Sequence, residues 1–389
     1  MNWRNGLGSV GRSGVALLVG LALAAITFQA GGFSAGGTAS GVVTGAITGP
    51  GSLALTLRYA LPLAFIAIGV VVSFRGGFFN AGAQGQFYAG GIVSLYVGLT
   101  LPTSLGGPIV AMLAILAGAV AGMVWSILPG LLRVYFNVNE VIGTLMFSFI
   151  AEYLVTYVAV GPLKSSAGAG QVAVTTSVPN AVRVTPASGI GIGVVLGVLL
   201  VGAAVWWLLR RTRFGFEIAL IGRNPVMAEV QGVEIRQIGL ATFAITGFTA
   251  GLGGAIEILG PLGSISSGYD PNIGLTAILV ALVGVLAVGG VLVAALVFGG
   301  LTAASLYLPI ATGLPSTSLV FLTGLVSFVV TAKVGWGRWS QGLAQRVRGG
   351  PRPGHRGDEV PVPSGAPPDA DERQRGTPAA SPGSVGTPV

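Results

Sequence analysis

The chain has 389 residues, of which 52% are hydrophobic and only 8% are charged, and its mean hydropathy is +0.83. A soluble domain carries roughly a quarter charged residues, so this composition excludes an ordinary water-exposed surface. The sequence has no cysteine, and its single histidine, His355, lies in a polar stretch. Disulfides and thiolate metal sites are therefore excluded, and histidine-dependent nucleophilic chemistry is close to excluded.

Repeated apolar runs of about 20 residues predict an all-α polytopic membrane protein, because a helix of about that length crosses a bilayer. The 65 glycines agree with this prediction, since small residues let helices approach closely in lipid. The net charge of +8 comes from basic residues that flank the apolar runs or lie in the C-terminal stretch. That placement favours a positive-inside topology over nucleic-acid binding.

The predicted elements begin with a cytoplasmic N-terminus at residues 1–13, which carries Arg4 and Arg12, and a first span at about 15–30. A cleaved signal peptide is the alternative for this first apolar run. Residues 31–52 are rich in Gly, Ser and Thr without a single charge, so we expect an external loop there.

The membrane domain is predicted at residues 14–334 and contains nine further apolar runs. They lie at about 53–73, 75–101, 109–132, 141–160, 189–209, 238–260, 273–288, 291–309 and 316–332. About ten spans place both ends of the chain in the cytoplasm, in agreement with the Lys and Arg residues beside the runs. Residues 335–389 are rich in Pro, Gly, Ser and charge, which predicts a cytoplasmic, mostly disordered tail.

Two segments half a chain apart interrupt the apolar pattern, "FFNAGAQGQ" (78–86) and "SISSGYDPNIGLTA" (264–277). Both predict broken or re-entrant helices, and broken helices at corresponding places in two halves point to a transport pathway. The amides of Asn80, Gln84 and Gln86 could line a path for a neutral hydroxylated solute, because an amide both donates and accepts hydrogen bonds. The alternative is that they only join helices through hydrogen bonds.

Four further polar positions lie within or beside predicted spans. Asn139 and Glu140 are candidate pathway residues at the start of one span, where favourable interaction of Glu140 with the helix dipole is the alternative role. Glu152 and Glu257 lie inside spans, and buried carboxylates can serve proton-coupled transport. We expect each to make an interhelical hydrogen bond instead, because no Arg, Lys or His is predicted at its depth.

The internal loop at residues 210–237 carries the signals of a short helix. Asn224 can cap free backbone N–H groups, and Pro225 suits the first helical position. The helix is predicted at 226–231, and Gly232 ends it. Such a helix could dock into a groove of another protein or lie on the membrane surface as an amphipathic connector, and the loop by itself leaves both open.

Four segments resemble, in the same order, the permeases of ATP-binding-cassette (ABC) importers of the branched-chain amino acid, ribose and nucleoside group. They are "FFNAGAQGQ" (78–86), "NEVIGTLM" (139–146), "ALIGRNPVMAEVQGVEI" (219–235) and "SGYDPNIGLTAILVALVG" (267–284). The resemblance covers most of residues 50–335 and is strongest to the nucleoside and simple-sugar branch. The chain departs from that branch at Gln84, where Glu is usual, and at 283–290, which lacks an Arg-containing turn.

The resemblance implies a type II ABC-importer-like permease fold in the cell membrane of a prokaryote. The chain would be the membrane subunit of an ATP-driven importer for a nucleoside or simple sugar, paired with a second permease, the same or related. An extracytoplasmic binding protein would deliver the solute. ATPase subunits would dock on the internal loop at Gly222, Arg223, Asn224, Pro225, Ala228 and Gly232.

No phosphate-loop motif G-x-x-x-x-G-K-[ST] occurs in the sequence, so ATP is expected on the partner subunits and no cofactor or metal on this chain. A proton-coupled secondary transporter and a passive channel for a small polar solute are the alternative functions.

Overall fold

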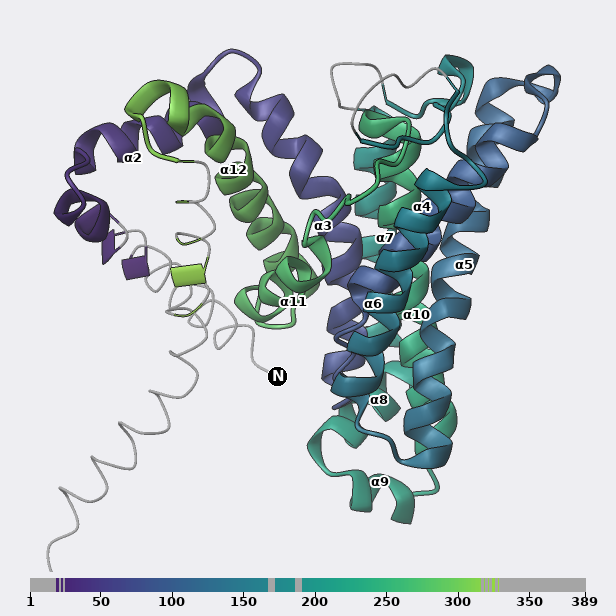
Figure 1. Cartoon of the computed structure of the whole chain (residues 1–389). Helices are drawn as coiled ribbons and strands as arrows, with labels where there is room; N and C mark the ends of the chain where they lie inside the picture. Colours follow the sequence, from purple (N-terminus) through teal and green to yellow (C-terminus); the bar gives the residue numbers. More distant parts are fainter. Residues whose placement is uncertain are drawn as a thin grey trace, which may run out of the picture. The chain divides into compact units, whose positions relative to one another are not determined.

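The computed structural model describes residues 25–166, 172–185 and 191–315 continuously, and positions 19, 20, 22, 23, 318, 321, 324, 325 and 328 singly. The predicted tail, the N-terminus at residues 1–13, part of the predicted span at 15–30 and most of the predicted span at 316–332 lie outside these residues. The described part is built from helices (Figure 1). Backbone pairing of the β type is confined there to two isolated antiparallel bridges, Lys164 with Thr175 and Val174 with Ser266.

Six described helices are long and apolar enough to cross a membrane, which confirms the prediction of an all-α polytopic protein. They are α3 (Ser52–Arg75), α5 (Gly107–Phe136), α6 (Glu140–Val160), α7 (Ile192–Arg211), α10 (Ile235–Glu257) and α12 (Val288–Thr312). Two shorter helices, α4 (Ala83–Thr100) and α11 (Ile273–Val283), stand where broken helices are predicted. Between α3 and α4, and between α10 and α11, the chain leaves the helical path.

The remaining described elements are short. They are α2 (Ala35–Val43), η1 (Thr44–Thr48), η2 (Thr103–Leu105), η3 (Asn180–Val182), α8 (Arg213–Arg223), α9 (Pro225–Val230) and η4 (Ile258–Leu262). The helices α2 and η1 correct the expectation of a loop at 31–52. Ser34 caps α2 through its side-chain oxygen, and Gly41 and Gly45 let the segment lie directly against α12. A glycine-rich composition therefore serves close helix packing here, and not a loop.

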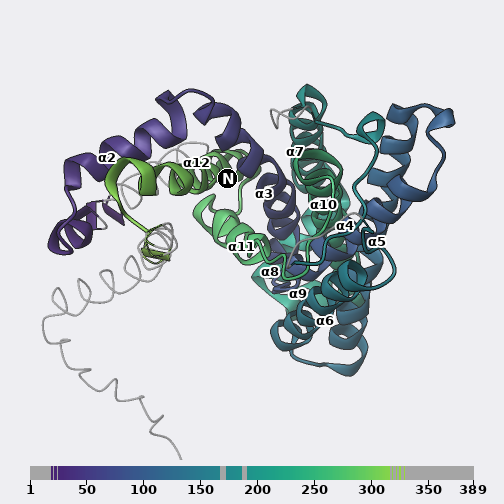
Figure 2. The same ribbon diagram turned by 45° about the horizontal axis from the view of Figure 1, so that its top comes forward.

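The core of the described part is formed by α10 with α3, α4 and α5, and Figures 1 and 2 show α4, α5 and α10 side by side. Gly90 of α4 packs directly against Gly251 of α10, so close that a Cβ on Gly90 would overlap the backbone of Gly251. Because lipid offers no hydrophobic drive for helix association, such close approach is what stabilises helix pairs in a membrane. The first interrupted segment leads into α4, and the second follows α10 and η4, so both adjoin this core.

Several helix ends meet at one end of the bundle. Gly222 of α8 lies against the backbone carbonyl of Arg75 at the end of α3, and the guanidinium of Arg236 lies 5.9 Å from the ring centre of Tyr135 in the last turn of α5. We call this the arginine-rich end, because its helices carry Arg75, Arg133, Arg210, Arg211, Arg213, Arg223 and Arg236. The described residues of the segment before α7, 161–166 and 172–185, lie at the opposite end (Figure 1).

Candidate functional site

The first interrupted segment links α3 to α4 over residues 76–82. Gly77 has a φ of +77°, a conformation that glycine adopts without strain, and the chain turns out of the helix there. The Arg75 guanidinium donates a hydrogen bond of 2.8 Å from Nε to the carbonyl oxygen of Leu286, at the turn between α11 and α12. This bond ties the end of α3 to the second half of the chain.

Three side chains of α6 satisfy the backbone of this segment and of the first turn of α4. Glu140, Thr144 and Ser148 are spaced by four residues, so they share one face of the helix. The segment's N–H groups point at this face. They donate from Phe79 to Glu140 Oε1 at 3.2 Å, from Ala81 to Thr144 Oγ1 at 3.1 Å and from Gly85 to Ser148 Oγ at 3.2 Å. The α6 face thus fixes the shape of an irregular backbone that cannot satisfy itself.

We expect Thr144→Val to lower the thermal unfolding midpoint of the detergent-solubilised protein. The substitution keeps the shape of the side chain but leaves the buried N–H of Ala81 without its acceptor, which costs about 1–3 kcal/mol. Thr100→Val is the matched control, because the Thr100 hydroxyl is exposed and donates only within its own helix. Equal midpoint shifts in the two variants would contradict the role assigned to Thr144.

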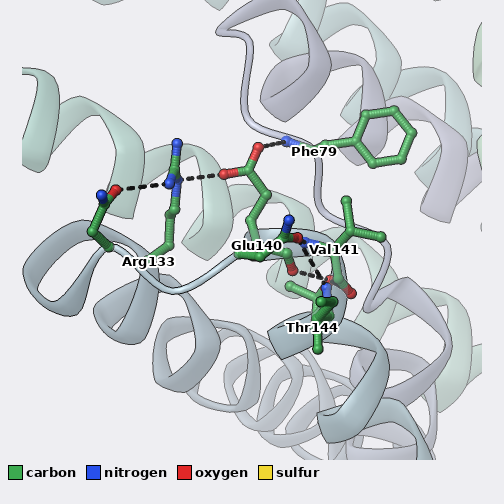
Figure 3. Close-up of polar contacts among 8 residues, drawn as sticks. Phe79, Arg133, Glu140, Val141 and Thr144 are labelled. Atoms are coloured by element: carbon green, nitrogen blue, oxygen red, sulfur yellow. Dashed lines mark hydrogen bonds and ion pairs between the residues drawn. The ribbon is translucent and has the colours of Figure 1, made fainter.

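Glu140 and Asn139 are the two predicted pathway residues on α6. Asn139 is the N-cap, and its Oδ1 accepts hydrogen bonds from the N–H groups of Val141 at 3.0 Å and Ile142 at 3.3 Å. Glu140 lies between Arg133, with which it forms an ion pair, and the Phe79 N–H (Figure 3). In this structure both side chains therefore make structural contacts, and contact with solute stays a prediction.

The amides of Asn80 and Gln86 form a buried pair within the first segment. The Gln86 Nε2 donates to Asn80 Oδ1 at 3.1 Å, the same oxygen accepts from the Gly82 N–H at 2.9 Å, and both side chains are almost fully buried. These contacts are local to the segment and the first turn of α4, so they do not join separate helices, and a pathway role for the two amides stays a prediction. Gln84 differs, because its side chain points away from this pair and toward the second interrupted segment.

The second interrupted segment, residues 263–272, meets α4 at Gln84 and Tyr88. Asp270 Oδ1 lies 3.1 Å from the Tyr88 hydroxyl and 3.5 Å from Gln84 Nε2. The Gln84 Oε1 accepts the backbone N–H of Gly274 in the first turn of α11, at the short distance of 2.5 Å. The two interruptions that the sequence predicts separately thus form one polar cluster, which we call the Asp270 cluster: Gln84, Tyr88, Tyr269, Asp270, Asn272 and Gly274.

Sequence reasoning missed Asp270 and Tyr88, although Asp270 lies inside the quoted segment 264–277. The available signal was a carboxylate within an interrupted apolar run, next to a tyrosine. Tyr88 carried no signal, because a tyrosine inside an apolar helix usually belongs to the core.

Glu257 corrects a second expectation. Its carboxylate lies 3.2 Å from the guanidinium of Arg58 on α3, so a basic partner does accompany it, contrary to the prediction. The two residues lie 199 positions apart in sequence, so no local sequence pattern pairs them. An ion pair between α3 and α10 is a structural tie that leaves Glu257 without the features of an isolated proton relay.

The short helix predicted at 226–231 is present as α9, one residue earlier in the sequence, whereas the longer helix α8 in the same loop was not predicted. The helix α9 begins at Pro225, Asn224 Oδ1 accepts the Met227 N–H at 3.1 Å, and Gly232 has a φ of +77° just after the helix. Ala228 is fully buried against the rest of the chain. The opposite face of α9 exposes three apolar side chains to solvent: Val226, Met227 and Val230.

The predicted docking residues thus divide by position. Ala228 faces inward, Gly222 lies against α3, and Asn224 with Pro225 and Gly232 shapes the helix ends. Arg223 is exposed as the last residue of α8. Their role in docking stays a prediction.

The comparisons with known proteins agree with this architecture. Residues 52–330 match the family described as "Branched-chain amino acid transport system / permease component". The chain is 29% identical over 324 residues to the guanosine ABC transporter permease protein NupP of Bacillus subtilis, covering 82% of this chain and 92% of that relative. It is 28% identical over 321 residues to the glucose ABC transporter permease protein TsgB13 of Haloferax volcanii, covering 79% and 83%.

A third relative is the nucleoside ABC transporter permease protein NupB of Lactococcus lactis, 27% identical over 281 residues, which cover 69% of this chain and 76% of the relative. The family match spans well over half of the sequence, and the described helices include six of membrane-spanning length. The chain therefore belongs to this family of transport-system permease components, and it is a multi-pass membrane protein.

Proposed function

We propose that this chain is the permease subunit of an ATP-driven importer that carries a nucleoside or a simple sugar across the cell membrane of a prokaryote. The observation that carries the proposal is the meeting, in the Asp270 cluster, of the second interrupted segment with the start of α4, directly after the first interrupted segment. Irregular backbone within a membrane protein is tolerated where it is buried in protein or lines a water-filled cavity. Hydroxyl, amide and carboxylate groups there suit a solute rich in hydroxyl groups.

The substrate class is supported by the relatives, whose names include guanosine, nucleoside and glucose transport. The chain itself adds that the cluster holds amide, hydroxyl and carboxylate groups but no Lys or Arg among its described contacts. Such a lining favours a neutral solute over an anionic one.

The arginine-rich end is proposed to face the cytoplasm, with both termini on that side. The rule that cytoplasmic loops carry an excess of Lys and Arg supports this orientation. At that end, the exposed apolar face of α9 would dock an ATPase subunit, which would bind and hydrolyse ATP in place of this chain. A second permease, the same or related, and an extracytoplasmic solute-binding protein facing residues 161–185 would complete the importer.

The test is uptake into proteoliposomes. We expect radiolabelled guanosine or D-glucose to accumulate only when the ATPase subunits, ATP and the loaded binding protein are all present. The control omits the ATPase subunits and applies an inward proton gradient. Uptake in that control would contradict the proposal in favour of proton-coupled transport, and a persistent ion conductance in a planar bilayer would contradict it in favour of a channel.

A further inference from the structure

The segment that carries Asp270 runs along α4 toward the interior of the bundle. Its first residue, Gly263, accepts a backbone hydrogen bond from Val178, whose side chain lies beside Gly98 near the end of α4. Its last part contacts α4 at Tyr88 and Gln84. At 1.5 Å per residue, Tyr88 and Gln84 lie about 15–20 Å from Gly98, toward the N-terminal end of α4. This distance is about half the thickness of a bilayer's hydrocarbon core.

Asp270 is exposed at this depth, as are its neighbours Gly268, Pro271 and Asn272. A charged side chain and irregular backbone are both strongly unfavourable against lipid, and they are tolerated at this depth where they are buried in protein or line a water-filled cavity. The exposure of Asp270 and its neighbours favours the water-filled cavity. In a transport protein, an aqueous space at mid-membrane depth is where the solute passes.

The carboxylate of Asp270 is held through one of its two oxygens. Oδ1 lies within hydrogen-bond distance of three donors: the Tyr88 hydroxyl at 3.1 Å, the Asn272 N–H at 3.2 Å and Gln84 Nε2 at 3.5 Å. Among the described residues no donor is recorded to Oδ2. A carboxylate accepts through both oxygens, so Oδ2 keeps its full accepting capacity while Oδ1 fixes the orientation of the group.

We propose that Asp270 Oδ2 is the hydrogen-bond acceptor for a hydroxyl group of the transported solute. The inference rests on the proposed function and adds to it the residue that distinguishes a hydroxylated solute from its deoxy analogue. Tyr88 and Gln84 are positioning residues, because they act on the solute only through Asp270. A hydrogen bond to an ionised acceptor is about twice as strong as one between neutral groups. A solute that lacks the hydroxyl group should therefore be transported less well than its parent.

The experiment is Asp270→Asn in the reconstituted importer. An amide at this position keeps an oxygen for the three donors and turns its N–H₂ outward. The hydrogen bonds that orient the side chain are therefore retained, while the acceptor proposed to face the solute is lost. Uptake is measured for guanosine and its 2′-, 3′- and 5′-deoxy analogues, and for D-glucose and its monodeoxy analogues, with the same binding protein throughout. Discrimination by the binding protein then cancels when variant and wild type are compared.

We expect Asp270→Asn to reduce the preference for the parent solute over one deoxy analogue by about 5- to 10-fold and to leave the other preferences unchanged. Glu234→Gln is the matched control, because it is the same conversion of an exposed carboxylate to an amide outside the Asp270 cluster. The Glu234 carboxylate accepts a hydrogen bond from Gln237 Nε2, which an amide oxygen also accepts, so wild-type preferences are expected.

Two results would overturn the inference. An equal loss of uptake for parent and analogues would show that Asp270 acts on structure alone, and sodium-dependent uptake abolished by Asp270→Asn would make it a cation site. A wild-type importer that takes up neither guanosine nor D-glucose contradicts the proposed function itself, and the inference falls with it.

Discussion

Replacing Val230 on α9 with Asp should abolish ATP-driven uptake while leaving the amount of protein in the membrane unchanged. Val230 is 79% exposed, and it lies with Val226 and Met227 on the face of α9 that points away from the buried Ala228. If this face docks an ATPase subunit, the new carboxylate is buried against apolar atoms without a partner. Central interface changes of this kind cost about 2–4 kcal/mol, which corresponds to roughly 30- to 1,000-fold weaker binding.

Co-purification of the ATPase subunit with the tagged permease measures this docking directly. The matched control is Val172→Asp, the same change at an exposed valine in the segment at the opposite end of the bundle. It should leave co-purification intact. If α9 is only a connector on the membrane surface, Val230→Asp will also leave co-purification intact, and the docking role is then wrong.

Gly222→Trp provides a second disruption of the same region. Gly222 lies so close to the Arg75 carbonyl that even a Cβ would overlap it, so a large side chain must push α8 away from α3. We expect loss of coupling with membrane insertion retained, because the spanning helices are unaffected. Deletion of residues 226–231 should give the same phenotype, since it removes α9 while α8 and α10 remain.

Gln84→Glu should have the second large effect, a loss of uptake of about 10-fold or more. The change places a second carboxylate about 3.5 Å from Asp270 and removes the donor that Gln84 Nε2 supplies. Repulsion between two such charges ranges from about 1 kcal/mol in water to about 4 kcal/mol near a protein surface. The cluster must then open or take up a proton, and both outcomes alter the link between the two interrupted segments.

The thermal unfolding midpoint tests whether the loss of uptake comes from repulsion between the carboxylates at positions 84 and 270. Gln84→Glu should lower the midpoint, and adding Asp270→Asn should restore it, because the amide and carboxylate then exchange places. The two changes are expected to couple by about 1–3 kcal/mol. Uptake should not recover in the double variant, since Asp270 is also the proposed acceptor for the solute.

Gln29→Glu is the matched control for this conversion of an amide to a carboxylate. Gln29 is exposed, and its Oε1 accepts the Ala35 N–H, a role that a carboxylate also fills. An unchanged midpoint and unchanged uptake in Gln84→Glu would show that the departure from the usual Glu at this position has no consequence.

The sequence alone determined the features that depend on short stretches of chain. The length and apolarity of the runs predict an all-α membrane protein, because backbone groups in lipid must be satisfied within each helix. Asn224, Pro225 and Gly232 predict the bounds of α9, because capping involves residues at most four apart. Glycine and amide clusters likewise predict where α3 stops before α4 begins and where α10 is separated from α11.

Only the tertiary structure decided which residues meet. Asp270 reaches Tyr88 across 182 positions, and Arg58 pairs with Glu257 across 199. The face of α6 that holds the first interrupted segment, and the packing that makes residues 35–48 helical, likewise depend on neighbouring helices. Local propensity cannot determine such contacts, because they follow from how closely helices pack and in which rotation. The sequence therefore located both interruptions, while packing alone joined them into one cluster.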